Sequence, residues 1–152
     1  MSTLGYKNAE IFQKKDIAKL QLIEAINLFV SENFLCSLTL AGAAEELFAG
    51  LLRSLDKKPV IEDSINRIKE IRENIGITVM EERTKSEIIK EWNHAKNRIK
   101  HHDADESKTV YFNDCDEAYW MIKRAILNAE SLGISIPNKL DFENWVIIKA
   151  CL

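Results

Sequence analysis

The chain has 152 residues, of which 46% are hydrophobic, and a formal net charge of −3 at pH 7. A chain of this size and composition can bury one core of ordinary proportions, so we expect residues 1–152 to form a single domain. The small net charge excludes tight, non-specific attachment to nucleic acid or to an acidic membrane through a global field, so any site for a polyanion must be local.

Helical periodicity dominates the chain, which holds only five glycines and two prolines. Apolar residues recur at intervals of three and four, which indicates an all-α fold. A first helix is expected from about Asp16 to Glu32. The residues predicted on its inward face are Ala18, Leu22, Ala25, Ile26 and Phe29.

A second helix should begin near Ser37 or Thr39, since either side chain can cap it. Its predicted inward residues are Leu40, Ala44, Leu47, Phe48, Leu51 and Leu55. A third helix, which follows Pro59 and ends at Gly76, has the most regular apolar stripe. That stripe consists of Ile61, Ile65, Ile68, Ile71 and Ile75. The segment Ile77–Glu82 fits either an extended strand or a continuation of the helix.

A fourth helix should open at Thr84, because Glu87 stands three residues later and completes a capping-box pattern. Its apolar stripe is Ile88, Trp92, Ala95 and Ile99. The polar stretch 103–112 is predicted to be a loop, after which Asn113 or Asp114 can cap a fifth helix that ends at Gly133. The inward residues of that helix are Ala118, Ile122, Ala125, Ile126 and Ala129.

The C-terminal segment from Phe142 to Ile148 is mostly apolar and should dock as a further helix. These elements together predict a five- or six-helix up-and-down bundle. Two large apolar residues of the fifth helix, Trp120 and Leu127, lie one heptad apart and away from its main stripe. They either pack beneath the C-terminal segment or form a homodimer interface.

The cysteines Cys36, Cys115 and Cys151 are odd in number and far apart. This pattern fits neither a disulfide framework nor a zinc site, and it favours buried thiols in a reducing compartment. The N-terminus lacks the layout of a signal peptide, and no uninterrupted apolar run approaches the roughly 18 residues of a membrane span. We therefore expect a cytoplasmic protein without a membrane segment.

The segment Lys96–Asp103 gathers cationic and imidazole side chains at the end of the fourth helix. On a helical projection Asn97 and His101 share the polar side, whereas Lys96 and His102 flank the apolar stripe. A histidine there could take a proton from a ribose hydroxyl while a cation stabilises the phosphate. The residue types alone favour a simpler alternative, in which these cations offset the helix dipole and stay in water.

The carboxylate of Glu45 borders the apolar face of the second helix, whereas Glu46 points to the opposite, wet side. Glu45 could therefore pair with Lys96 or with a histidine. A metal hypothesis arises because Glu91-x-x-His94 has the spacing found in di-iron bundles. Such a site needs two pairs of this kind and the chain has one, so we expect no metal or other cofactor.

Two of these segments resemble the HEPN superfamily of small α-helical bundles. Residues 40–47, Leu-Ala-Gly-Ala-Ala-Glu-Glu-Leu, look like the Ala-x-Glu-rich second helix of that family. Lys96-Asn97 followed by His101 or His102 is similar to its Arg-polar-spacer-His motif, with Lys96 in place of the arginine. In active members this motif forms a metal-independent ribonuclease site at a dimer interface, often in toxin or defence systems.

The resemblance implies an RNA-binding protein or a metal-independent endoribonuclease that acts as a homodimer. The implied catalytic residues are Lys96, Asn97, His101, His102 and Glu45. Because lysine presents a point charge where arginine presents a rigid fork, the alternative is a non-catalytic module that binds a partner protein. A metal-binding bundle is the third hypothesis.

Overall fold

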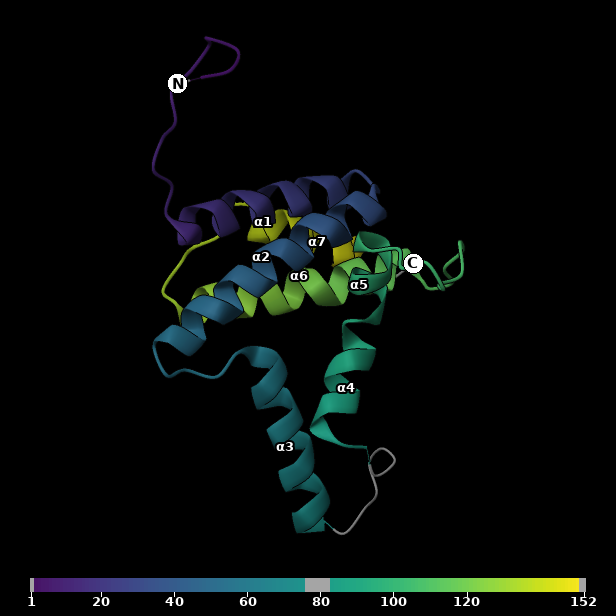
Figure 1. Cartoon of the computed structure of the whole chain (residues 1–152). Helices are drawn as coiled ribbons and strands as arrows, with labels where there is room; N and C mark the ends of the chain where they lie inside the picture. Colours follow the sequence, from purple (N-terminus) through teal and green to yellow (C-terminus); the bar gives the residue numbers. More distant parts are fainter. Residues whose placement is uncertain (1, 76–82, 151–152) are drawn as a thin grey trace.

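The computed structural model describes residues 2–75 and 83–150, and this part of the chain contains seven helices and no strand (Figure 1). The helices are α1 (Lys14–Val30), α2 (Phe34–Ser54), α3 (Val60–Ile75), α4 (Lys85–Trp92), α5 (His94–Lys100), α6 (Asp114–Ser131) and α7 (Lys139–Ala150). The predicted all-α class is confirmed. The count exceeds the five or six expected because the predicted fourth helix is divided into α4 and α5.

The main core lies between α1, α2, α6 and α7, with α2 packed between α1 and α6 (Figure 1). At one end of this core the ring of Phe29 meets Phe34, Phe142 and Trp145 edge to face, with ring centroids 4.8 to 5.1 Å apart. Each such pair contributes about 0.5–1.5 kcal/mol beyond the burial of its area. These contacts attach α7 to α1 and α2.

The inward faces predicted for two helices are confirmed completely. All five residues named for the first helix, from Ala18 to Phe29, are fully buried in α1. The five named for the fifth helix are buried in α6, and the Asn113 side chain accepts a hydrogen bond from the Asp116 backbone amide at 3.1 Å. Beyond the end of α6, Gly133 adopts φ 72°, as a left-handed C-terminal residue does.

The inward face predicted for α2 is confirmed at Ala44 and Phe48 but is narrower than the observed one. Leu38, Ala41 and Leu52 are buried, whereas Leu55 is 58% exposed and lies beyond the helix. The reason is that α2 packs extensively against both α1 and α6 and also contacts α5, so it buries a wide face that a single stripe does not describe. By length and composition alone α2 could also cross a membrane, but half of its most apolar window is buried inside the bundle, and a core helix passes the same test.

Helices α3 and α4 form a hairpin that projects from the bundle, which we call the arm (Figure 1). The arm has a small core of its own, in which Ile61, Ile65 and Ile88 are buried. The predicted apolar stripe of α3 is wrong at its outer part, where Ile71 is 46% exposed because α3 extends beyond the bundle there. The predictions for Gly76 and for Ile77–Glu82 lie outside the described residues.

The predicted fourth helix begins as expected but breaks at Asn93. The capping box is present, since the Thr84 backbone amide donates to Glu87 Oε2 at 2.7 Å and the Glu87 amide donates to Thr84 Oγ1 at 3.3 Å. At the break Asn93 has φ −104° and ψ 1°. Arg124 of α6 donates to the Trp92 carbonyl oxygen at 3.3 Å, which the break frees, and to Asn93 Oδ1 at 2.9 Å.

One of the two alternatives for Trp120 and Leu127 is removed, and the prediction of buried thiols is wrong. Trp120 is 62% exposed and Leu127 is 40% exposed, so the C-terminal helix α7 does not cover them. Cys36 is exposed and Cys115 is only partly buried, so these thiols are not the buried ones that we expected. Cys151 lies outside the described residues.

Candidate functional site

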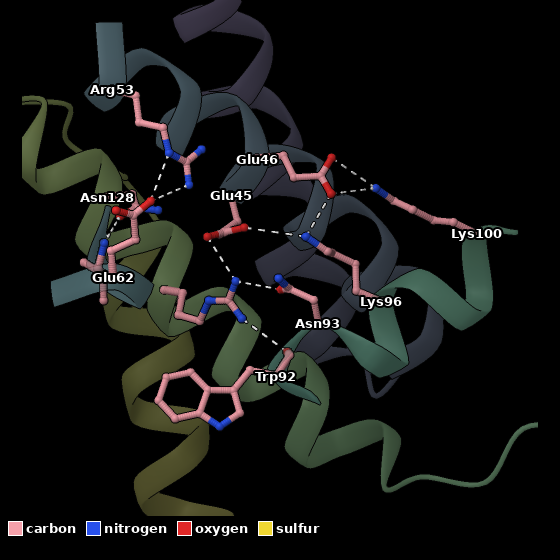
Figure 2. A network of polar contacts seen from close by, with 11 residues as sticks. Glu45, Glu46, Arg53, Glu62, Trp92, Asn93, Lys96, Lys100 and Asn128 are labelled. Carbon is pink, nitrogen blue, oxygen red and sulfur yellow. Dashed lines mark hydrogen bonds and ion pairs between the residues drawn. The ribbon is translucent and has the colours of Figure 1, made fainter. Parts of the chain in front are cut away.

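Five charged side chains from three helices form a connected group, which we call the charge cluster (Figure 2). Its members are Glu45 and Glu46 of α2, Lys96 and Lys100 of α5, and Arg124 of α6. Figure 2 shows the two glutamates side by side on α2, with the lysines of α5 directed toward them. The cluster therefore joins α2, α5 and α6 at the root of the arm.

The centre of the charge cluster is buried. The side chains of Lys96 and Glu45 are each only 4% exposed, and Lys96 Nζ lies 3.7 Å from Glu45 Oε2 and 2.8 Å from Glu46 Oε1. The other oxygen of Glu45 lies 3.1 Å from the Arg124 guanidinium. An uncompensated charge at this depth would cost several kcal/mol, so each buried charge depends on its partners. The predicted pairing of Glu45 with Lys96 is thus present.

A glycine makes room for Lys96. A Cβ atom added to Gly42 would lie 2.6 Å from Lys96 Cδ and 2.8 Å from its Cγ, which is closer than van der Waals contact allows. The lysine stem therefore crosses the surface of α2 directly over Gly42 on its way to the carboxylates. This close approach is the local reason that α2 carries glycine at a buried helical position despite its low helix propensity.

The electrostatics of Glu46 follow from its two lysine neighbours. Partial burial raises the pKa of the Glu46 carboxyl, but the hydrogen bond and charge of Lys96, together with the charge of Lys100, outweigh this effect. The pKa of Glu46 is therefore lowered from its ordinary value. Glu46 is half-exposed, so solvent screens part of this interaction.

A polar pocket of about 350 Å³ opens beside the charge cluster, between the bundle and the arm. It is lined by Glu45, Glu46, Arg53, Asn93, Lys96, Asn97 and Arg124, together with apolar side chains. Three of the predicted site residues, Glu45, Lys96 and Asn97, thus meet at one pocket. The cations that line it are all ion-paired. Lys96 and Arg124 pair with Glu45, and Arg53 pairs with Glu62 at 3.0 Å.

The two remaining predicted residues, His101 and His102, line a separate pocket of about 370 Å³, which we call the histidine pocket. Its other walls come from Arg98–Lys100, from Glu106–Lys108 and from Val110. Helix α5 ends at Lys100 and His101 is extended, with φ −130° and ψ 149°. The helical projection that separated His101 from His102 is therefore wrong, because neither residue is helical, and both are exposed at the same pocket.

The cations around the histidine pocket differ in how firmly they are held. Arg98 lies 2.8 Å from Glu106 and also donates to the Ser107 carbonyl oxygen at 3.4 Å. Lys100 lies 3.3 Å from Glu46. The idea that all cations of this segment stay in water is wrong for Lys96, whose side chain is buried.

The carboxylates proposed as metal ligands form ion pairs instead of a cluster of ligands. Glu91 is ion-paired with Arg83, and Glu45 is engaged by Lys96 and Arg124. Across residues 2–75 and 83–150 no three His, Cys, Asp or Glu side chains are placed to hold a metal ion together.

The residue that the sequence did not single out is Arg124. It is largely buried and bridges the charge cluster to the break at Asn93. A signal for it exists in the sequence, because Arg124 lies between the inward residues Ile122 and Ala125 of α6, where a cation needs a partner. That partner is not identifiable without the fold.

Comparison of the chain with protein-family models, curated proteins and solved structures finds no significant match.

Substitution of Gly42 by alanine should destabilise the protein, because the new methyl group would displace the buried Lys96 stem. Overpacking of this kind costs about 1–3 kcal/mol, against a gain in helix propensity of about 1 kcal/mol. The matched control is Gly50→Ala in the same helix, where nothing lies within 4 Å of the added Cβ and the free energy of unfolding should rise by about 0.5–1 kcal/mol. Urea denaturation measures both, and equal shifts in the two variants would contradict the role of Gly42.

Substitution of Glu46 by glutamine should change how stability depends on pH. Because the pKa of Glu46 is lowered in the folded protein, the carboxylate stabilises the fold at pH values above 4.5, its ordinary pKa. This contribution is lost as the pH falls through the lower pKa of the folded protein. Glu46→Gln should therefore melt below the wild type at neutral pH, with the difference narrowing below about pH 4.5. Thermal melts from about pH 7 to about pH 3 test this, with exposed Glu70→Gln as the control for the loss of one charge.

Proposed function

We propose that the chain is a HEPN-like helical bundle that binds RNA at the histidine pocket and cleaves it without a metal. The observation that carries the proposal is the composition of this pocket. Two exposed imidazoles, His101 and His102, stand in a wall with three cationic side chains and one carboxylate. Such a surface favours a phosphodiester, because the cations attract the phosphate and the imidazoles can act as general base and general acid.

The proposed reaction needs only the groups at hand. One imidazole takes the proton from the ribose 2′-hydroxyl, and the 2′-oxygen attacks the phosphorus as the bond to the 5′-oxygen breaks. The second imidazole gives a proton to the departing 5′-oxygen, which leaves a 2′,3′-cyclic phosphate and a free 5′-hydroxyl. Cations of the wall stabilise the charge on the phosphate oxygens in the transition state.

Lys96 has a structural role in this proposal and not a catalytic one. The Lys96 ammonium already contacts Glu45 and Glu46 and is buried, so we assign it to holding α5 against α2. Asn97 is exposed on the neighbouring turn, where it can contact the substrate beyond the histidine pocket. Glu45 supports the site through Lys96.

The double substitution His101→Ala/His102→Ala should abolish RNA cleavage that persists in the presence of a chelator. A general acid or base contributes about 10²–10⁴-fold, so each single variant should already lose about a hundredfold or more. The matched control is His94→Ala, since His94 is exposed on α5 but does not line the histidine pocket. Cleavage of a labelled RNA on a denaturing gel is the measurement, and undiminished cleavage by the double variant would refute the proposal.

A second candidate function, a non-catalytic interaction module, is favoured by one observation. Trp120 and Leu127 are exposed on α6, and large aromatic residues concentrate at the cores of protein interfaces. In the catalytic proposal the same surface serves the homodimer. In the alternative it is the whole function, and no RNA is cleaved.

If Trp120 belongs to an interface, Trp120→Ala should weaken self-association or partner binding by at least about tenfold, as loss of a central aromatic anchor does. Sedimentation equilibrium measures the dimer constant. Leu20→Ala provides the control, because Leu20 is similarly exposed but lies on α1. A protein that is monomeric with or without Trp120 would count against the homodimer.

A further inference from the structure

Lys100 takes part in both the charge cluster and the histidine pocket. Its side chain lines the pocket next to His101, while its ammonium reaches back to the two carboxylate oxygens of Glu46 at 3.3 and 3.4 Å (Figure 2). The pair therefore stands between the two pockets, because Glu46 lines the polar pocket and Lys100 lines the histidine pocket.

The two lysines on Glu46 are bound with unequal strength. Lys96 lies at 2.8 Å, within the usual range of about 2.7–2.9 Å for a charge-assisted hydrogen bond, and it is buried. Lys100 lies at 3.3 Å, and the Glu46 side chain that it contacts is 51% exposed. An exposed ion pair such as that between Lys100 and Glu46 contributes little to stability. If Lys100 leaves, Glu46 keeps Lys96 as its counter-charge.

The other cations of the histidine pocket are less suited to binding a phosphate tightly. Arg98 is held at 2.8 Å by Glu106, which lines the same pocket, and it also serves the Ser107 carbonyl oxygen. Lys108 makes no ion pair within the described ranges, but it is exposed and nothing there fixes it in place. Lys100 combines a side chain that is only 22% exposed with a weak partner.

We propose that Lys100 is the phosphate ligand of the histidine pocket and that Glu46 competes with the phosphate for it. The inference rests on the proposed RNA function and names the residue that supplies its charge. An incoming phosphodiester draws the Lys100 ammonium away from Glu46, which remains paired with Lys96. Glu46 thus weakens RNA binding, although it is not itself a group that touches the substrate.

The test measures binding of a labelled 2′-O-methyl oligoribonucleotide, which lacks the attacking hydroxyl and so cannot be cleaved. Glu46→Gln should bind about two- to fivefold more tightly, since an exposed ion pair is worth up to about 1 kcal/mol. Lys100→Gln should bind more weakly, and its slope of log affinity against log salt should fall by about 0.7, the value for one lost phosphate contact on a single strand. If Glu46 had only a structural role, Glu46→Gln would weaken binding instead.

A double variant and a matched control complete the experiment. In the Lys100→Gln background, Glu46→Gln should bring no further gain, because there is no Lys100 ammonium left to release. Glu62→Gln is the control for charge, since Glu62 also bridges two cations, Arg53 and Lys85, but does not line the histidine pocket. Its affinity should equal that of the wild type.

Each remaining outcome has a fixed meaning. Unchanged or weaker binding by Glu46→Gln, or a gain that persists without Lys100, would overturn the inference while leaving the proposed RNA function in place. Absence of binding by the wild type would refute the proposed function and the inference with it. If Glu46→Gln fails to fold, the wild type is titrated with inorganic phosphate instead. The NMR signal of Lys100 Cε should then shift, while that of Lys96 Cε stays unchanged. An unmoved Lys100 signal would overturn the inference.

Discussion

The rest of the structure depends on one constraint, the need to compensate the buried ammonium of Lys96. The two glutamates of α2 supply the opposite charge, and Arg124 of α6 balances the second oxygen of Glu45. Because these groups belong to three helices, their pairing fixes how α5 crosses α2 and how both meet α6. Buried ion pairs contribute little net stability compared with apolar packing, but loss of one partner leaves a costly lone charge. The cluster therefore specifies the arrangement more than it strengthens the fold.

Arg124 extends the same constraint to the arm. Its guanidinium is shared between Glu45, the Trp92 carbonyl oxygen and the Asn93 side chain. A helix that runs straight through Asn93 would use that carbonyl itself and carry α4 in the direction of α5. The break instead lets α4 turn away and pair with α3, and a second small core forms there. One buried arginine thus connects the charge balance of the bundle with the direction in which the arm projects.

These relations explain which parts of the fold the sequence could predict. The faces of α1 and α6 follow from periodicity, because each of these helices packs mainly against α2, and the capping box at Thr84 is a local pattern of four residues. The face of α2 and the break at Asn93 depend instead on contacts with partners far along the chain. The sequence pairs neither Gly42 with Lys96 nor Asn93 with Arg124. Residue types at the site were predictable, whereas their division between two pockets was not.

The separation into two pockets gives Lys96 and Lys100 different surroundings. Lys96 is committed to a buried pair, and its flexible stem fits over Gly42, where a planar guanidinium would have to find a different path to the carboxylates. In the proposed RNA function, the charge for the phosphate must then come from farther along α5, where Lys100 stands beside His101. Glu46 connects the two lysines and is held by the buried one. In that proposal the structural role and the binding role are divided between two lysines one helical turn apart.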